Sequence, residues 1–127
     1  MITLDANVMI AALDVRDAHH RDAARLLRER GGHGLLMHPI SIAEVLVRPA
    51  TQGGADEVFA RMHGAGVVSI ESSARDPLLL ANLRARTRLR MPDCCVLLAA
   101  ARSGFTLATF DEGVRGAADA LGIPIVS

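Results

Sequence analysis

Short apolar runs alternate with longer amphipathic stretches along the chain, and this alternation is the feature that most limits its fold. The apolar runs predict strands over residues 2–4, 35–37, 67–70, 105–109 and 123–126. The stretches between them predict helices over residues 8–13, 18–30, 42–48, 55–63, 76–89, 94–102 and 112–121. Alternating strands and helices are typical of a parallel sheet covered by helices. We therefore expect one α/β domain over residues 1–127, with a parallel sheet of four to five short strands and helices on both faces.

Several boundaries have specific signals. Ser41 followed by Glu44 matches a capping box, which predicts a helix beginning after Ser41 and ending before Pro49. Asp76 is predicted to cap the next long helix, which runs to about Leu89. Pro124 lies within the last apolar run, so that strand is expected at the edge of the sheet.

Four acidic residues are placed so that they can meet at one edge of the sheet. Asp5 directly follows the first strand, and Asp111 stands just beyond the fourth. Glu44 and Asp93 lie in the first turns of helices that are expected to begin at the same edge. In open α/β sheets this carboxyl edge is where ligands bind. The pattern therefore predicts an acidic cleft built from four distant segments.

Such a cleft suits a hard divalent cation, Mg²⁺ or Mn²⁺, because these ions prefer oxygen ligands. Two carboxylates about 5 Å apart repel each other by roughly 3 kcal/mol, and a bound cation offsets that cost. Each position also has an ordinary structural explanation. Asp5 and Asp111 could be helix caps, Glu44 the partner of Ser41 in a capping box, and Asp93 a residue favoured by the helix dipole.

The basic residues narrow the possible function classes. All 14 are arginine, and the sequence contains no lysine. Response-regulator receivers and HAD-like phosphatases need a lysine at their acidic sites, and Asp5-x-Asn7 lacks the second aspartate of the phosphatase motif. A phosphate-binding P-loop also requires lysine. These three classes are therefore excluded.

The formal net charge is zero, so any nucleic acid must be bound by a local patch. Candidate substrate-binding arginines precede Asp93: Arg84, Arg88 and Arg90, with Arg86 among them. On a continuous helix, Arg84 with Arg88 and Arg86 with Arg90 would form two i, i+4 stripes that run towards the acidic site. A solvated helix face is the alternative.

Cysteine and histidine residues point to no further site. Cys94 and Cys95 are neighbours, so a disulfide between them would be strained, and buried inert thiols are expected. His19 and His20 could touch RNA, although solvated helix positions are the simpler interpretation. No apolar run is long enough to span a membrane, and no basic leader precedes the first strand, so we expect a cytoplasmic protein without a signal peptide.

Four segments carry a resemblance to a known family: Leu4-Asp5-Ala6-Asn7, Ser41-Ile42-Ala43-Glu44-Val45, Pro92-Asp93 and Thr109-Phe110-Asp111. Together they resemble the PIN-domain ribonucleases, specifically the VapC-like toxins of type II toxin–antitoxin pairs. The resemblance covers essentially the whole chain. Cys94 stands where members of that family often have alanine, and it is also small.

The resemblance implies a PIN-like fold and hydrolysis of RNA phosphodiester bonds with Mg²⁺ or Mn²⁺. It assigns metal binding and catalysis to Asp5, Glu44, Asp93 and Asp111, with support from Thr109. Asn7 and Ser41 are expected to support these residues without binding the metal ion themselves.

A homodimer and an inhibitory antitoxin protein are the implied partners, and such partners often place a basic side chain in the acidic site. The residues suggest a groove between segments 8–13 and 18–30 for an amphipathic part of that partner. The alternative is a degenerate PIN-like domain that only binds a partner.

Overall fold

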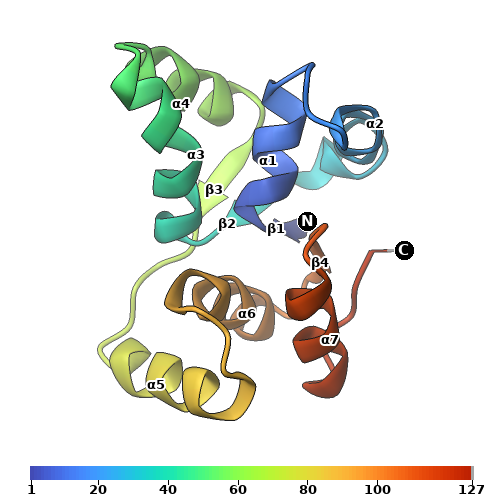
Figure 1. Cartoon of the computed structure of the whole chain (residues 1–127). Helices are drawn as coiled ribbons and strands as arrows, with labels where there is room; N and C mark the ends of the chain where they lie inside the picture. Colours follow the sequence, from blue (N-terminus) through green and yellow to red (C-terminus); the bar gives the residue numbers. More distant parts are fainter. Residues whose placement is uncertain (127) are drawn as a thin grey trace.

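Four short parallel strands form the centre of the protein (Figure 1). The computed structural model describes residues 1–126. The strands are β1 (Ile2–Leu4), β2 (Leu35–Met37), β3 (Val67–Ser69) and β4 (Thr106–Ala108), in the order β3-β2-β1-β4. Ile2 is in register with Leu35 on one side and with Thr106 on the other. The predicted parallel α/β fold is confirmed.

Seven helices and one 3₁₀ turn connect and cover the strands. They are α1 (Ala6–Leu13), α2 (His20–Arg30), η1 (Gly31–His33), α3 (Pro39–Thr51), α4 (Ala55–Gly64), α5 (Asp76–Thr87), α6 (Met91–Ser103) and α7 (Glu112–Ala120). In Figure 1, α1 to α4 lie on one side of the sheet and α5 to α7 on the other. No helix within residues 1–126 is long and apolar enough to cross a membrane.

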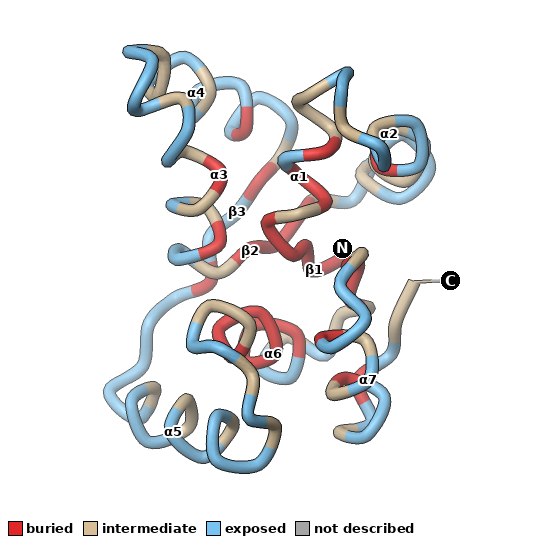
Figure 2. Tube along the Cα trace, viewed as in Figure 1, coloured by how far each residue is buried: buried red, intermediate tan, exposed pale blue. Residues whose placement is uncertain are grey.

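The two faces of the sheet bury alternate strand residues, as the period of two requires. Ile2 and Leu4 belong to the core under α1 to α4, whereas Leu36 and Leu107 pack among residues of α6 and α7. The middle of α6 is buried on every side, from Cys94 to Ala100 (Figure 2). The prediction of a buried α6 with two buried free thiols is confirmed.

Helix α3 differs from the prediction at both ends. It begins at Pro39, whose fixed φ suits the first helical position, and the ring Nδ1 of His38 caps it by accepting the Ile40 N–H at 3.0 Å. Ser41 therefore lies inside the helix, and the capping box is wrong. The helix also continues through Pro49, because the N–H groups of Gln52 and Gly54 both bond the Pro49 carbonyl and close the last turn.

Helix α2 also begins later than predicted. It starts at His20, two residues after the expected position, because the side chains of Asp14 and Asp17 accept the N–H groups of Arg16 and His19. Such aspartate turns hold the chain outside the helix.

Helix α5 ends two residues earlier than predicted. Arg88 takes a left-handed conformation with φ of 62°, the only positive φ at a non-glycine residue within residues 1–126. The Thr87 hydroxyl accepts the Leu89 N–H and so holds the chain in this turn. Asp76 lies in the first turn of the helix, not at its cap, and pairs with Arg102 of α6.

The C-terminal segment lies beside β4, at the sheet edge where it was predicted. It forms a single parallel bridge between Leu107 and Ile125 instead of a full strand. Two backbone bonds hold this bridge, from Leu107 N to the Pro124 carbonyl and from Val126 N to the Leu107 carbonyl, both 2.8 Å. Pro124 has no N–H to donate, which limits the pairing.

Because the middle of α6 is buried, shortening a side chain there should destabilise the protein far more than shortening an exposed one. Leu97 is fully buried at the centre of α6, so Leu97→Ala should lower the free energy of unfolding by about 2–5 kcal/mol. Leu78 on α5 is 51% exposed, and Leu78→Ala should change it by no more than about 0.5 kcal/mol. Urea denaturation of both variants measures the difference. Equal losses would contradict the assignment of α6 to the core.

Candidate active site

The strand order places a switch point between β1 and β4. From β1 the chain proceeds outward to β2 and β3, and then returns to the other side of β1 as β4. The carboxyl ends of two strands that diverge in this way form the crevice where open α/β sheets bind ligands. Asp5 follows β1 there and Thr109 follows β4, and the Asp5 N–H bonds the Ala108 carbonyl at 3.0 Å.

Hydrogen bonds hold the Asp5 carboxylate in place. Asp5 is only 6% exposed. Its Oδ2 accepts the Thr109 hydroxyl at 2.7 Å and the Asn7 amide Nδ2 at 3.3 Å. The Asn7 Oδ1 in turn accepts the Phe110 N–H at 3.2 Å, and Thr109 Oγ1 accepts the Asp111 N–H at 3.1 Å. Asn7 and Thr109 therefore fix Asp5 and join the ends of β1 and β4.

Three of the four predicted carboxylates, Asp5, Glu44 and Asp93, influence one another electrostatically, and Asp111 acts on Asp93. Burial raises the pKa of Asp5, and the charge of Asp93 raises it further, while the Thr109 hydrogen bond acts in the opposite direction. Burial also raises the pKa of Glu44, and the charges of Asp5 and Asp93 add to that rise. The pKa of Asp93 is raised by burial, with Arg90 opposing and Asp111 reinforcing the shift. Electrostatic coupling thus links Asp5, Glu44 and Asp93 directly, and Asp111 through Asp93.

Two of the predicted site residues, Asp111 and Ser41, lie at the starts of helices α7 and α3. Asp111 Oδ1 caps α7 by accepting the Val114 N–H at 2.9 Å. The predicted alternative, a helix cap, is therefore correct for one of the two carboxylate oxygens. Ser41 is fully buried in the first turn of α3, one turn before Glu44. Its hydroxyl is the one buried side-chain polar atom without a hydrogen-bond partner in the described part of the chain.

The donor set fits a hard divalent cation in its chemistry. The four side chains offer only carboxylate oxygens, and their charges repel one another. Among residues 1–126, however, no three acidic, histidine or cysteine side chains lie close enough together to hold an ion as they stand. Binding an ion therefore requires at least one carboxylate to swing inward. Glu44 and Asp93 are less buried than Asp5, which leaves them freer to do so.

Of the predicted substrate-binding arginines, only Arg90 lies beside the carboxylates. Its Nε is 3.8 Å from Asp93 Oδ2, and its side chain is 80% exposed. The Arg84 guanidinium bonds the Leu89 carbonyl, and Arg88 ends α5 in the left-handed conformation. The two i, i+4 stripes are therefore wrong, because the helix stops before Arg88.

Three further residues beside the site were not singled out as site residues by the sequence pattern. The Arg115 guanidinium donates to the Thr109 carbonyl at 3.4 Å. His19 stacks on Phe110 with ring centroids 4.4 Å apart and an interplanar angle of 13°. Arg115 could have been found from its spacing, since it lies one helical turn after Asp111. The contact between His19 and Phe110 has no local signal, and His20 instead bonds the Ala11 carbonyl at 2.8 Å.

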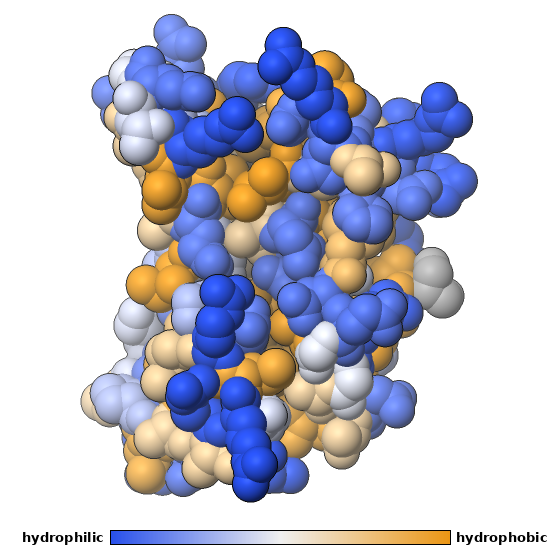
Figure 3. All heavy atoms as spheres, in the orientation of Figure 1, coloured by the Kyte–Doolittle hydropathy of each residue, from blue (hydrophilic) through white to orange (hydrophobic). Residues whose placement is uncertain are grey.

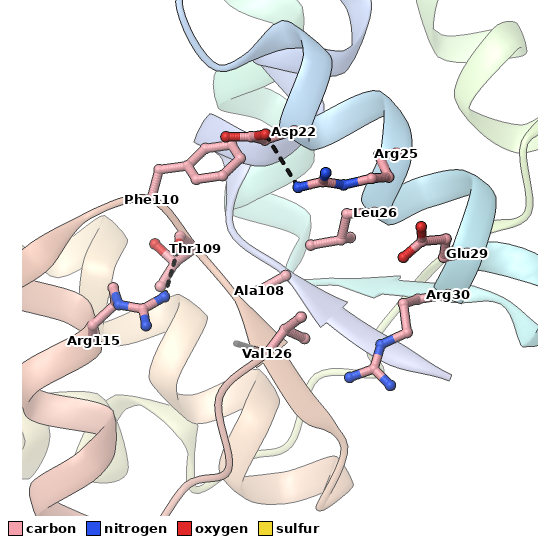
Figure 4. Close-up of a pocket in the computed structure, with 10 residues that line it drawn as sticks. All are labelled: Asp22, Arg25, Leu26, Glu29, Arg30, Ala108, Thr109, Phe110, Arg115 and Val126. Carbon is pink, nitrogen blue, oxygen red and sulfur yellow. Dashed lines mark hydrogen bonds and ion pairs between the residues drawn. The ribbon is translucent and has the colours of Figure 1, made fainter.

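Arg115 and Phe110 line a cavity of about 660 Å³ on the other side of Thr109. The remaining lining residues come from α2, from β4 and from the C-terminal segment: Asp22, Arg25, Leu26, Glu29, Arg30, Ala108 and Val126. Figure 4 shows Arg30 and Arg115 on opposite sides of this cavity, with apolar side chains between them.

Comparison with known proteins agrees with this architecture. The family model for the PIN domain matches residues 2–120. A solved toxin–antitoxin complex from Klebsiella pneumoniae superposes with a TM-score of 0.75 at 21% identity, covering 100% of this chain and 97% of the other.

The Neisseria gonorrhoeae FitAcB structure gives a TM-score of 0.67 at 18% identity, covering 100% of this chain and 97% of that chain. The structure of FitAB bound to an IR36 DNA fragment gives 0.71 at 18% identity, covering 99% and 94%. No curated protein matches the chain.

The raised pKa values of Asp5, Glu44 and Asp93 predict that the free energy of unfolding falls as the pH rises. Raised pKa values mean that the folded protein keeps its carboxyl protons to higher pH than the unfolded chain does, so ionisation destabilises the fold as pH rises. We expect Asp93→Asn to be more stable than the parent at pH 7, with the difference vanishing below about pH 4, where the carboxyls are protonated.

Asp56→Asn is the matched control, because Asp56 also lies in the first turn of a helix but is exposed and outside the cluster. Asp56→Asn should lose the favourable interaction of its charge with the helix dipole, and it has no carboxylate repulsion to relieve, so it should not be more stable than the parent. Unfolding free energies from urea titrations between pH 4 and pH 7 test both variants. If Asp93→Asn is less stable than the parent at pH 7, the carboxylates do not repel one another as proposed.

Proposed function

The chain belongs to the PIN-domain family, and we propose that it is a Mg²⁺- or Mn²⁺-dependent endoribonuclease that acts as the toxin of a toxin–antitoxin pair. The observation that carries this proposal is the buried Asp5 at the switch point of the sheet, electrostatically coupled to Glu44 and Asp93, with Asp111 acting on Asp93. Asp5 occupies the N-cap position of α1, but its side chain makes no capping hydrogen bond to that helix, so the predicted cap does not explain this carboxylate.

The residues present favour water as the nucleophile. The Thr109 hydroxyl is engaged with Asp5, Ser41 is buried, and both cysteine thiols are buried. No hydroxyl or thiol is therefore presented to a phosphodiester from the described part of the site. A divalent ion held by Asp5, Glu44, Asp93 and Asp111 would polarise water and neutralise charge on the phosphate.

Each carboxylate has a distinct part in this proposal. Asp5 is held rigidly by Thr109 and Asn7, so it sets the position of the centre. Glu44 comes from the second turn of α3, not from its first turn as predicted, and Asp93 from the first turn of α6; both would turn towards Asp5 to hold the ion, and Asp111 would contribute the oxygen that does not cap α7. Arg90 lies against Asp93 at the rim, where it can contact a phosphate, and Arg84 and Arg88 stay predicted backbone contacts farther along.

A protein partner is the second part of the proposal. The predicted groove between α1 and α2 is wrong, because Val8 and Ala23 are fully buried and Leu26 and Leu27 pack into the same core. A different groove of about 370 Å³ lies between α1, α3 and α4, with Ile10, Leu13, Val45 and Val58 among its lining residues. Figure 3 shows apolar surface gathered between α1 and α3.

Charge complementarity indicates what this groove binds. Its lining includes three arginines, Arg16, Arg48 and Arg61, and it reaches the acidic site at Glu44. An amphipathic segment with acidic residues along its edge fits the groove, and a basic residue at its end can reach Glu44. We identify this occupant as the inhibitory antitoxin.

A homodimer is the third part. The edge strand β3 exposes Val68, and Phe59 of α4 is exposed beside an apolar cavity of about 300 Å³. Apolar side chains next to an unpaired sheet edge are typical of a surface that another chain covers. Sedimentation analysis of the free protein tests this assembly.

The nuclease proposal predicts cleavage of RNA that requires a divalent metal ion. The protein freed of any partner should cleave RNA with Mg²⁺ or Mn²⁺ and stop when EDTA is added. Asp5→Asn and Asp93→Asn should each lower the cleavage rate at least about 100-fold, because removing even a supporting residue of a metal site costs 10- to 100-fold.

Asp119→Asn on α7, away from the cluster, serves as the control and should cleave like the parent. Cleavage that persists in EDTA would exclude the metal mechanism. An absence of cleavage combined with tight partner binding would favour the degenerate PIN-like binding module.

The partner proposal predicts a site-specific loss of binding. Ile10 is 39% exposed in the groove, so Ile10→Glu should weaken binding of a co-expressed neighbouring-gene product at least tenfold. Val15 is 78% exposed outside the groove, and Val15→Glu should leave binding unchanged. Calorimetry on the purified pair measures both affinities. Equal effects of the two substitutions would show that the partner docks elsewhere.

A further inference from the structure

The cavity beside Thr109 is connected to the acidic site through a single residue. Thr109 turns its hydroxyl towards Asp5 and its carbonyl towards Arg115, and it also lines the cavity. Thr109 therefore belongs both to the acidic site and to the wall of this cavity. Its volume of about 660 Å³ lies in the range of pockets that hold small organic ligands.

Positive charge in the cavity is available for a ligand. Of its three arginines, Arg25 pairs with Asp22 at 3.3 Å, a pair that is exposed on both sides. Within residues 1–126, Arg30 and Arg115 form no ion pair with any carboxylate, although Glu29 also lines the cavity. Arginine binds phosphate through two parallel N–H groups, so these two side chains suit a phosphodiester.

Flat apolar surface adjoins these arginines. Leu26 and Val126 lie between Arg30 and Arg115, and Phe110 borders the cavity (Figure 4). His19 stacks on Phe110 and is exposed just outside the cavity lining, so it extends the aromatic surface from Phe110 beyond the cavity. Proteins that bind single strands combine backbone-binding cations with aromatic platforms in this way.

We propose that this cavity is a nucleotide subsite that holds the RNA residue next to the scissile phosphodiester. Arg30 and Arg115 bind its phosphate, and its base lies against the stack formed by Phe110 and His19. The inference rests on the proposed ribonuclease function and adds a substrate-recognition site beside Thr109, in addition to Arg90 beside Asp93. An acidic peptide would use the arginines but has no need of the aromatic stack, so a nucleotide accounts for more of the lining.

Binding of a labelled single-stranded RNA oligonucleotide tests the arginines. The measurements are made in the Asp5→Asn background, so that the RNA stays intact, and as a function of salt. Arg30→Gln with Arg115→Gln should weaken binding at least about tenfold at 50 mM salt. It should also lower the salt slope of log K by about 1.4, which is about 0.7 for each lost phosphate contact on a single strand.

Arg21→Gln with Arg28→Gln is the matched control. It removes the same charge from exposed positions of α2 that do not line the cavity, and should weaken binding no more than about twofold. Arg30→Lys with Arg115→Lys keeps both charges and should retain the parent slope. Thermal melting of each protein establishes that it is folded.

The aromatic stack is tested separately, because stacking does not depend on salt as phosphate contacts do. His19→Ala should weaken RNA binding at least about fivefold without changing the salt slope, and His19→Phe should restore it. If the cavity pair and the control pair weaken binding equally, only overall charge matters and the subsite is wrong. It is also wrong if RNA binding is unchanged but partner binding is lost.

The subsite and the nuclease proposal can fail independently. The subsite is judged by RNA binding, whereas the nuclease proposal is judged by EDTA-sensitive cleavage with the parent protein. Loss of RNA binding in the cavity variants, together with a parent that does not cleave, would keep the subsite and reject catalysis.

Discussion

The hydrogen bond from the Thr109 hydroxyl to the Asp5 carboxylate is the interaction on which the rest of the site depends. It joins residues 104 positions apart at the ends of β1 and β4. A hydrogen bond to a charged group contributes about 1.5–3 kcal/mol, which partly offsets the burial of a carboxylate that is 6% exposed. Without it the carboxylate at the switch point would be buried and poorly compensated. Asn7 completes the arrangement by bonding both Asp5 and the backbone of Phe110.

Electrostatic repulsion within the cluster is the second organising constraint. Asp5, Glu44 and Asp93 all have raised pKa values, with burial as the main cause and neighbouring carboxylates adding to it. Burial and mutual repulsion of these carboxylates lower the stability of the fold. A bound cation would offset that repulsion. Because the net charge is zero, positive potential near these carboxylates can come only from local arginines. Arg90 lies beside Asp93, and Arg115 donates to the carbonyl of Thr109.

The helix ends show where local signals compete. Ser41 and Glu44 have the spacing of a capping box, yet His38 and Pro39 begin the helix a turn earlier. Proline at the first helical position outweighs the later signal, because its φ is already helical and its missing N–H has no partner there to lose. At the other end, Pro49 lies in the last turn, where its missing N–H removes one bond from a helix that is about to end. Arg88 stops α5 without glycine, which no sequence rule predicts at that position.

The sequence by itself determined the alternation of strands and helices, the parallel sheet and the buried α6, and it predicted four acidic positions towards one sheet edge. These follow from periodicity and from the rule that parallel strands share a carboxyl edge, both of which can be read locally. Only the tertiary structure decided that Thr109 and Asn7 bond Asp5, that a groove lies between α1, α3 and α4, and that Arg84 and Arg88 do not extend a stripe towards Asp93. It also decided that His19 stacks on Phe110. Each of these depends on contacts between segments far apart in the chain, or on a turn whose outcome those contacts settle, and such contacts leave no trace in local spacing.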